Sequence, residues 1–338
     1  MSQKRVRVGV IGLGVGEQHL LGFLQDSRCE VTTLCDLTPD HARAVAHRLG
    51  AAVRVTDRAE EILLDPDVDA VSLATYDQDH ADQTCQALET GKHVFVEKPL
   101  CRTAAELHRV YQAWSRQGGR LKLASNLVLR SAPVFTWLRD RVQEGQFGRT
   151  YAFDGDYLYG RIHKITAGWR GQVEEYSVME GGGIHLLDLF LWITGERPAT
   201  VQAVGNRICT EGTAFRYDDF ATALLQCPSG LVARITANFG CVHRHFHVVR
   251  LFGTRGTFVS DDQGPRIHTT RDEAVQAAPL RLPVRESSKA ALIPEFVEAI
   301  VSDRDWNAET RLHFDVLSVC LACDRARQTQ APVGVEYV

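Results

Sequence analysis

The sequence predicts an α/β domain built on a doubly wound parallel sheet, followed by an α+β domain with a large, open and predominantly antiparallel sheet. In the first half, apolar β-branched runs alternate with amphipathic segments in steps of about 25 residues, the pattern of βαβ units. In the second half, strand-like runs follow one another with turns between them, which favours antiparallel pairing. A chain of 338 residues is long enough for two such domains. We place them at 1–125 and 126–338, with the C-terminal helix free to pack back on the first.

Buried parallel strands and intervening helices are expected in the first domain. The clearest helix is 38–50, because Pro39 stands in its first turn and Gly50 lies just past its end. Ligands of parallel sheets bind at the carboxyl ends of the strands, so the residues that follow each strand are the first candidates for a site. The expected strands are the apolar runs at 6–12, 30–36, 69–75 and 92–98.

A glycine-rich turn, GLGVGEQH at 12–19, follows the first strand. Gly12 permits the tight turn, and Gly14 lets a pyrophosphate approach the backbone at the start of a helix. The dinucleotide fingerprint places its third glycine at 17, but Glu17 stands there and Gly16 comes one residue early. The turn predicts a dinucleotide site, with a purely structural turn as the alternative.

Asp36 ends the second strand, at the distance where a carboxylate binds the hydroxyls of the adenosine ribose. Leu37 follows it, and no adjacent arginine is present to hold a 2′-phosphate. NAD is therefore favoured over NADP as the cofactor. Arg43, on the following helix, keeps NADP open as the alternative.

The second domain is expected to be a sheet with one early helix. Helical spacing at 180–195 puts His185 and Asp188 one turn apart on the same face. The segment 262–288 is predicted to be loop and edge structure, and 314–328 is predicted to be a closing helix. The strand-like runs are 150–160, 199–209, 220–240 and 245–260, with a hairpin signal, CPSG, inside the third.

Composition excludes several classes of function. The net charge of −4 implies no basic face, so nucleic acid is not an expected partner. No run is apolar and long enough to span a bilayer, so no membrane partner is expected. An odd number of cysteines, nine, without regular spacing, favours reduced thiols in a cytoplasmic protein.

Two patterns raise the question of a metal or redox site. Cys320 and Cys323 form a lone C-x-x-C within helical apolar spacing, which favours buried helix cysteines over a zinc or redox pair. His243, His245 and His247 alternate, so we expect them to share one face of a strand. Three imidazoles on one face are an alternative metal site, but the prediction is that no metal binds.

The chain resembles the glucose–fructose oxidoreductase and inositol dehydrogenase family over essentially its whole length. The resemblance implies a Rossmann-type nucleotide domain and a sheet domain that often mediates homo-oligomer contacts, in a dimer or tetramer. It also implies NAD(P)-dependent hydride transfer at a hydroxyl or keto carbon of a sugar, sugar nucleotide or cyclitol. The motifs that carry it are VGVIGLG at 8–14, Asp36, GKHVFVEKP at 91–99, EGQFGR at 144–149, GIHLLD at 183–188 and GTRGT at 253–257.

The resemblance implies two catalytic residues. Lys98, at the end of a strand, would stabilise the developing alkoxide and share its proton. His185 would take the hydroxyl proton as hydride departs, because imidazole titrates near neutrality. Glu97 would approach the nicotinamide side, and Pro99 would fix the strand's exit, in the family often through a cis bond. The alternative makes Glu97 and Lys98 a solvated loop pair, and His185 an ordinary packed residue.

One position departs from the family pattern. Inositol-dehydrogenase-like members have Asp four residues before the histidine, where this chain has Gly181. The proton relay would then use Lys98 and His185 alone, or borrow Glu180, and Asp188 would bind substrate or orient a neighbour. The departure puts myo-inositol itself in doubt as the substrate.

The remaining site residues are assigned by position along the chain. The expected cofactor-binding residues are Gly12, Leu13, Gly14, Val15, Gly16, Asp36, Leu37, Thr75, His80, Glu97, Lys98 and Asn126. The expected substrate-binding residues are Tyr157, Lys164, Trp169, Arg170 and Asp188. A basic and aromatic mixture of this kind would suit a phosphorylated or nucleotide-linked sugar.

Two other functions remain open because fold alone does not fix function. One is a non-redox member that keeps the fold as a ligand-binding or regulatory subunit. The other is an enzyme whose tightly held NAD is recycled in place through a second substrate. Joint presence of Asp36, Lys98 and His185 favours the dehydrogenase.

Overall fold

A computed structural model describes residues 5–168, 171, 173, 175–283 and 288–338. The chain divides into two compact units. Unit 1 comprises Met1–Ser131, Glu286–Phe314 and Val338, and unit 2 comprises Ala132–Arg285 and Asp315–Tyr337. The long helix α10 (Asn307–Thr329) contributes its first residues to unit 1 and the rest to unit 2.

Unit 1 contains a six-stranded parallel sheet in the order β3-β2-β1-β4-β5-β6. This order is that of a doubly wound dinucleotide-binding sheet, so the predicted fold class of the first domain is confirmed. Strand β3 was not predicted, because it is too short to show a period. The strands are β1 (Val6–Ile11), β2 (Cys29–Cys35), β3 (Arg54–Thr56), β4 (Ala70–Leu73), β5 (His93–Val96) and β6 (Leu123–Ser125).

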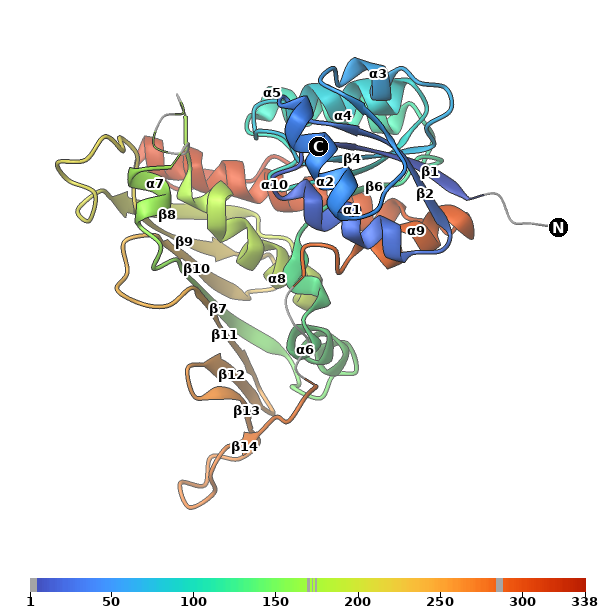
Figure 1. Ribbon diagram of the computed structural model, residues 1–338. Coiled ribbons are helices and arrows are strands. Elements are labelled where there is room, and N and C mark those ends of the chain that lie inside the picture. The colour runs from blue at the N-terminus through green and yellow to red at the C-terminus, as the bar shows by residue number, and fades with distance from the viewer. Residues whose placement is uncertain (1–4, 169–170, 172, 174, 284–287) are drawn as a thin grey trace. The chain divides into compact units, whose positions relative to one another are not determined.

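Helices cover both faces of this sheet (Figure 1). One face carries α1 (Gly16–Gln25), α2 (Pro39–Arg48) and α9 (Ile293–Val301). The other carries α3 (Glu60–Leu63), α4 (His80–Glu89) and α5 (Ala104–Ser115), and a short 3₁₀ turn, η1 (Val128–Ser131), follows β6. Helix α5 begins with a capping box, in which Thr103 and Glu106 satisfy each other's backbone N–H groups.

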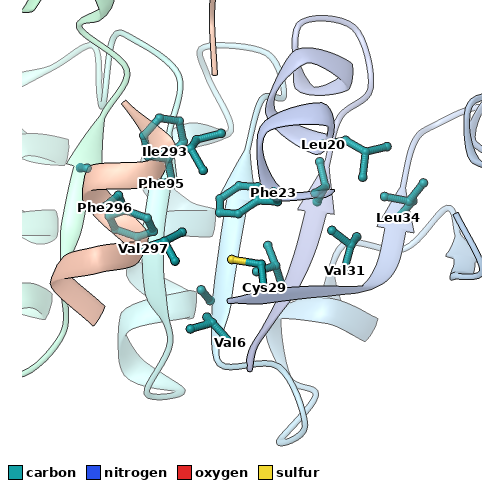
Figure 2. Packing of buried hydrophobic residues seen from close by; sticks show 14 of the residues in the cluster. Val6, Leu20, Phe23, Cys29, Val31, Leu34, Phe95, Ile293, Phe296 and Val297 are labelled. Carbon is teal, nitrogen blue, oxygen red and sulfur yellow. The ribbon is translucent and has the colours of Figure 1, made fainter. Parts of the chain in front are cut away.

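The core of the first face joins segments far apart in the sequence (Figure 2). Phe95 of β5 packs between Phe23 of α1 and Phe296 of α9, with ring centroids 6.4 and 5.5 Å apart. All three rings are almost completely buried. Helix α9 therefore completes the hydrophobic core of unit 1, although it follows eight of the nine strands of the unit 2 sheet in the sequence.

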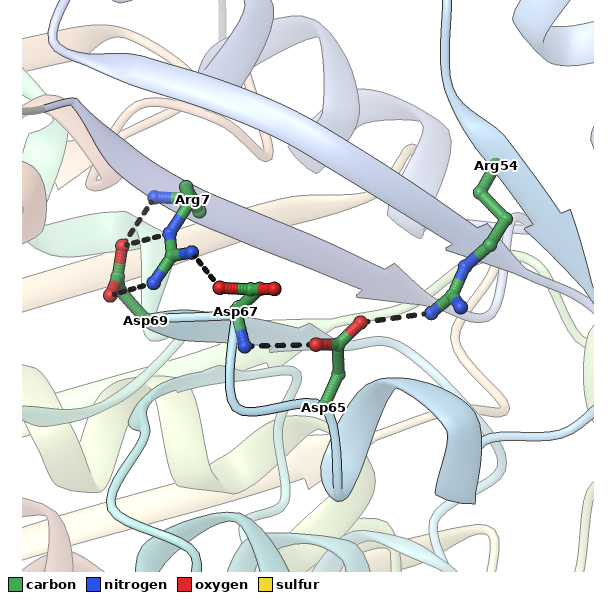
Figure 3. A network of polar contacts seen from close by, with 5 residues as sticks. All are labelled: Arg7, Arg54, Asp65, Asp67 and Asp69. Atoms are coloured by element: carbon green, nitrogen blue, oxygen red, sulfur yellow. Dashed lines mark hydrogen bonds and ion pairs between the residues drawn. The ribbon is translucent and has the colours of Figure 1, made fainter.

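An ion-pair network lies at the amino ends of the strands (Figure 3). Both terminal nitrogens of the Arg7 guanidinium are used: Nη2 donates to Asp69 Oδ1 at 3.0 Å, and Nη1 donates to Asp67 Oδ1 at 2.5 Å. Asp65 accepts from Asp67 N–H and from the Arg54 guanidinium. The network ties β1 to the loop before β4 and leaves the carboxyl edge of the sheet free of its charges.

Unit 2 contains a nine-stranded sheet in the order β14-β13-β12-β11-β7-β10-β9-β8-β15. All neighbours are antiparallel except β7 and β10, so the predicted large and predominantly antiparallel sheet is confirmed. The strands are β7 (Thr150–Leu158), β8 (Thr200–Asn206), β9 (Phe220–Gln226), β10 (Val232–Asn238), β11 (Phe246–Gly253), β12 (Thr257–Asp261), β13 (Gly264–His268), β14 (Ala278–Pro279) and β15 (Val333–Gly334).

Helices accompany the second sheet in unit 2. A π-helical segment (Met179–Gly183) runs into α8 (Ile184–Thr194), and both pack on β7 and β10, while α6 (Pro133–Gln143) packs on α8. Unit 2 also contains α7 (His163–Thr166) and the second part of α10. Gly155 of β7 lets Leu186 of α8 approach, because a Cβ there would lie 3.1 Å from the leucine Cβ. Cys320 and Cys323 of α10 are completely buried, and the predicted buried helix cysteines are confirmed. No helix within the described ranges is both long and apolar enough to cross a membrane.

Candidate active site

The carboxyl ends of the unit 1 strands bring the predicted cofactor residues to one edge. Four residues that directly follow a strand donate their N–H to a carbonyl of the neighbouring strand at the same distance. Gly12 bonds Cys35, Ala74 bonds Ile11, Glu97 bonds Leu73 and Asn126 bonds Val96, all at 2.8 Å. The sheet ladder therefore fixes the backbone from which the turn at 12, Glu97 and Asn126 project.

The glycine turn has the conformation that its sequence predicts. Gly12 has φ +83°, and a Cβ there would lie 2.4 Å from the carbonyl oxygen of Ala74. A Cβ on Gly14 would meet nothing within 4 Å, so the backbone is open for a ligand to approach. Gly16 packs α1 closely on β4, since a Cβ there would lie 3.1 Å from the Ala74 Cβ. Gly16 thus performs the packing role of the third fingerprint glycine, and Glu17 turns outward to pair with Arg48 at 2.6 Å.

The Asp36 carboxylate joins the end of β2 to this turn. It accepts hydrogen bonds from the N–H of Leu13 at 2.9 Å and of Thr38 at 3.0 Å. His41 Nδ1 lies 3.5 Å from Asp36 Oδ2. Val15 and Leu37, which are predicted to line the cofactor, are both exposed. Arg43, the residue that keeps NADP open, pairs with Asp40 at the protein surface.

Glu97 lies in a buried polar cluster that was not predicted from the sequence. Its Oε1 atom lies 3.2 Å from His19 Nε2, and Lys289 Nζ lies 3.7 Å from the same oxygen. The other ring nitrogen of His19 lies 2.9 Å from Ser72 Oγ on β4. Glu97 is 7% exposed, which contradicts the alternative of a solvated loop pair for this residue.

Asn126 completes the cluster. Its Nδ2 atom donates to Glu97 Oε1 at 2.8 Å and to the carbonyl oxygen of Lys289 at 2.9 Å, and lies 3.0 Å from His19 Nε2. The Glu97 carboxylate and the Lys289 carbonyl can only accept, so they use the two N–H groups of the amide and fix its orientation. Its Oδ1 atom is buried and has no hydrogen-bond partner among the residues that the structure describes. An unsatisfied buried acceptor of this kind is a place for a donor on a ligand.

The cluster keeps Glu97 ionised. Burial alone raises the pKa of a carboxyl, but here the hydrogen bond with His19 and the positive charges of Lys289 and Lys98 outweigh it. The pKa of Glu97 therefore lies well below its ordinary range. A fixed negative charge stands directly before Lys98.

Lys98 is half-buried and precedes Pro99 through a cis peptide bond. His80 is completely buried, and its Nδ1 lies 2.7 Å from the Pro99 carbonyl oxygen, so the start of α4 holds the segment after Lys98. Thr75 Oγ1 donates to Gln83 at 2.9 Å. The predicted residues at the ends of β4 and β5 thus support one another.

In unit 2, His185 lies in an aromatic cluster. Its ring is stacked on Tyr157, with centroids 6.1 Å apart, and stands edge-on to His247 at 6.3 Å. Tyr157 and His247 are direct cross-strand partners of β7 and β11. His245 lies 5.2 Å from Tyr157 and 5.0 Å from His247. His185 and the predicted substrate residue Tyr157 are therefore brought together, along with two histidines that we had not assigned to the site.

The prediction that three alternating histidines share one strand face is wrong. Strand β11 begins at Phe246, so of the three only His247 lies in it. His243 is in the preceding turn, where its Nε2 lies 2.8 Å from Asp262 and its Nδ1 lies 2.7 Å from the Arg244 carbonyl oxygen. The described part of the chain holds no group of three or more His, Cys, Asp or Glu residues suited to a metal.

Gly181 has a neighbour that explains the absence of a side chain there. A Cβ on Gly181 would lie 2.3 Å from the Tyr176 hydroxyl oxygen and 3.4 Å from Phe239. The next residue is equally confined, because a Cβ on Gly182 would lie 2.4 Å from the Tyr157 ring. A tyrosine hydroxyl therefore fills the position that the family aspartate would need.

The other predicted substrate residues have different surroundings. Asp188 is completely buried one turn after His185 on α8. Lys164 is exposed on α7. Trp169 and Arg170 lie outside the described residues.

Comparison with known proteins gives a consistent result for both units. A family model for the GFO/IDH/MocA oxidoreductase family, with an NAD-binding Rossmann fold, matches residues 6–125. A second model, for the GFO/IDH/MocA C-terminal domain, matches residues 135–259.

Curated relatives are distant. The chain is 31% identical over 210 residues to a 1,5-anhydro-D-fructose reductase of Ensifer adhaerens, a match that covers 59% of this chain and 60% of that protein. It is 26% identical to glucose-fructose oxidoreductase domain-containing protein 2 of Homo sapiens, over 80% of this chain and 70% of that protein. An inositol 2-dehydrogenase of Salmonella typhimurium is 26% identical, over 67% of this chain and 65% of that protein.

Solved structures share the fold over almost the whole chain. A levoglucosan dehydrogenase in complex with NADH and levoglucosan has a TM-score of 0.85 at 21% identity, covering 99% of this chain and 100% of that one. A myo-inositol 2-dehydrogenase of Lactobacillus plantarum has a TM-score of 0.82 at 18% identity, covering 98% and 100%. At these identities the likeness establishes the fold alone.

Proposed function

The chain belongs to the GFO/IDH/MocA oxidoreductase family, and from this we propose that it is an NAD-dependent dehydrogenase or reductase. Its substrate would be a sugar, sugar nucleotide or cyclitol, and the reaction would take place at a hydroxyl or keto carbon. The observation that carries the proposal is the set of groups at the carboxyl edge of the unit 1 sheet: the open Gly14 backbone, the Asp36 carboxylate, and the Glu97–Asn126 cluster beside Lys98.

The residues present fit a nicotinamide dinucleotide. The Gly12–Gly16 turn would hold the pyrophosphate, Asp36 would accept from the ribose hydroxyls, and the buried Oδ1 of Asn126 would accept from a carboxamide N–H. NAD is preferred over NADP because the Asp36 carboxylate would repel a 2′-phosphate and Arg43 is paired with Asp40. The nicotinamide would supply the hydride acceptor or donor.

The side chains of this protein would handle the proton. In the direction of oxidation, the Lys98 ammonium would stabilise the negative charge that develops on the substrate oxygen. His185 would accept the hydroxyl proton, as hydride leaves the same carbon. In the direction of reduction, the proton returns by the same route. Gly181 leaves no carboxylate four residues before His185, so the relay would use Lys98 and His185 without one.

A homo-oligomer through the unit 2 sheet is part of the proposal. The face of this sheet opposite the buried one exposes Val204, Leu224 and Val232 of three neighbouring strands. Arg234 on the same face pairs with Asp156 at 2.6 Å. Molar mass from light scattering, at several protein concentrations, tests whether the protein forms a dimer or a tetramer.

The first test is absorbance at 340 nm with NAD against a panel of free sugars, cyclitols, sugar phosphates and sugar nucleotides. We expect one substrate class to give NADH. Lys98→Ala should lower kcat by about 10³-fold and His185→Asn by about 10²-fold, within the usual range for acid–base groups. The matched control is His268→Asn, because His268 is an exposed histidine at the end of β13 and should leave kcat unchanged.

The outcomes separate the alternative functions. Full activity in Lys98→Ala would exclude the proposed role of this lysine. Silence across the panel, with NAD or NADH released on denaturation, would favour a cofactor recycled in place. Silence without any bound or bindable nucleotide would favour a non-redox member of the fold.

A further inference from the structure

The helical segment that carries His185 is held at its start by Ser177 and by Asp324 of α10, which together we call the anchor. The Ser177 hydroxyl oxygen accepts hydrogen bonds from the N–H of Met179 at 3.1 Å and of Glu180 at 3.2 Å. These are among the first N–H groups of the helical run, which have no partner within the helix itself. The same hydroxyl lies 2.7 Å from Asp324 Oδ1 on α10. Because the two N–H groups use its lone pairs, the hydroxyl donates its proton to the carboxylate.

The segment held in this way has few side chains of its own to fix it. It runs from Val178 through the π-helical residues Met179–Gly183 directly into α8 and His185. Three consecutive residues of it are glycines, so this part of the backbone is restrained by the neighbours that pack on it and not by side chains of its own. π-helical turns inside helices recur at functional sites. The anchor therefore restrains the amino end of this segment, and the position of that end determines where His185 lies.

The charge of the Asp324 carboxyl depends on few groups. Dense packing around its carboxyl raises the pKa of Asp324 to about 7; the Ser177 hydrogen bond lowers it and the negative charge of Asp218 raises it. Asp218 precedes β9 and pairs with Arg327 of α10 at 2.6 Å. The Cys323 thiol next to Asp324 is neutral, because burial raises its pKa well above the ordinary value. Among these groups, Asp218 is the one whose charge raises the pKa of Asp324.

We propose that Asp324 is a positioning residue for catalysis: its carboxylate orients the Ser177 hydroxyl as the cap of the segment that carries His185. The inference rests on the proposed function, since it concerns the residue assigned there as the proton acceptor. When the carboxylate is neutralised, the Ser177 hydroxyl loses a charge-assisted hydrogen bond and the cap weakens. A displacement of about 1 Å at a reacting group can cost up to 10²-fold in rate, so a loosened segment lowers turnover.

Asp324→Asn tests the proposal while preserving shape. We expect kcat at pH 8 to fall about tenfold, with the KM for NAD unchanged, because the expected NAD-binding groups lie in unit 1. The ratio of wild-type to variant kcat should approach one at pH 5.5 and rise through neutral pH as Asp324 ionises. Asp218→Asn should move that rise to lower pH, since it removes a neighbouring negative charge. Ser177→Ala should reproduce the loss, and adding Asp324→Asn to it should cost nothing further.

Hydrogen exchange gives a readout that does not depend on turnover. In the unliganded protein, Asp324→Asn should exchange the amides of 178–185 about tenfold faster, with the amides of β9 and β10 unchanged. Unchanged exchange, or wild-type kcat and pH profile in the variant, overturns the proposal. Faster exchange in a protein whose wild type is inactive on every substrate supports the anchor and contradicts the proposed function instead.

Discussion

Two carboxylates, one in each unit, are packed among protein atoms and differ in charge behaviour. Glu97 accepts from Asn126 at 2.8 Å, lies 3.2 Å from His19 Nε2, and has Lys289 at 3.7 Å, so its pKa is held well below the ordinary range. Asp324 receives one hydroxyl hydrogen bond and faces the like charge of Asp218. Packing raises its pKa to about 7, the hydrogen bond lowers it, and Asp218 raises it.

The two residues show that burial alone does not determine the charge of a carboxylate. Desolvation disfavours the charged form at both positions, and the number and charge of the donors decide the result. With several donors, Glu97 is a constant negative charge at neutral pH. With one donor, Asp324 changes its charge within the working pH range. Variants at the two positions should therefore have effects of opposite sign on stability.

Glu97→Gln should have the largest effect. The free energy of unfolding of unit 1 should fall by about 3 kcal/mol at pH 7, because removing one partner leaves buried positive and polar groups uncompensated. Since the folded-state pKa of Glu97 is lowered, its contribution is present above its ordinary value of 4.5 and declines as pH falls below it. The difference in the free energy of unfolding between wild type and variant should therefore become smaller towards pH 3. Pulsed hydrogen exchange in urea, read on the peptides of β5 and β6, measures it.

The matched control for this variant is Glu17→Gln. Glu17 pairs with Arg48 at the protein surface, at 2.6 Å with side chains 27% and 57% exposed. Such a pair contributes less than about 1 kcal/mol. Equal losses from the two variants would mean that the Glu97 cluster has no special energetic role.

Asp324→Asn should act in the opposite direction. A rise in pKa from 3.8 to about 7 corresponds to at most about 4 kcal/mol of destabilisation by the charged form, at 1.36 kcal/mol per unit. Because Asp324 keeps some exposed surface, we expect a gain of about 2 kcal/mol for unit 2 at pH 8. The folded state binds the proton more tightly, so wild-type stability falls as pH rises from about 4 to 7 relative to the variant. A variant less stable than wild type at pH 8 would show that the carboxylate is not strained.

Most of the fold could be predicted from sequence because hydrophobic period and turn residues act locally. The alternation of apolar runs with helices gave the parallel sheet of unit 1, and the succession of strand-like runs gave the mainly antiparallel sheet of unit 2. Strand β3 (Arg54–Thr56) was missed because three residues cannot show a period. The parallel pairing of β7 with β10 was also invisible, since pairing partners are chosen by the tertiary fold.

The candidate site was predictable only where one motif contains its residues. Glu97 and Lys98 follow a recognisable strand, but Lys289 reaches Glu97 from a segment nearly two hundred positions later. His19 stands in the quoted glycine motif, one turn after Gly16, and its spacing was a usable signal that was not used. Asp324 lies in a helix whose apolar pattern indicates only burial. Contacts of this kind depend on how distant elements pack and leave no local pattern.

Gly181→Asp, in unit 2, should have the smallest effect on stability of these variants. The new Cβ would lie 2.3 Å from the Tyr176 hydroxyl oxygen, so the variant should lose about 1.5 kcal/mol, as overpacked sites do. Tyr176→Phe removes that oxygen but leaves the ring, and in this background the loss should shrink by about 1 kcal/mol because the closest contact is gone. Urea unfolding of the four proteins of the cycle, read on β10 peptides, measures the coupling. If the stability losses of the two variants are additive, the tyrosine hydroxyl is not what excludes a side chain at position 181. A carboxylate four residues before His185 would then be accommodated by movement elsewhere.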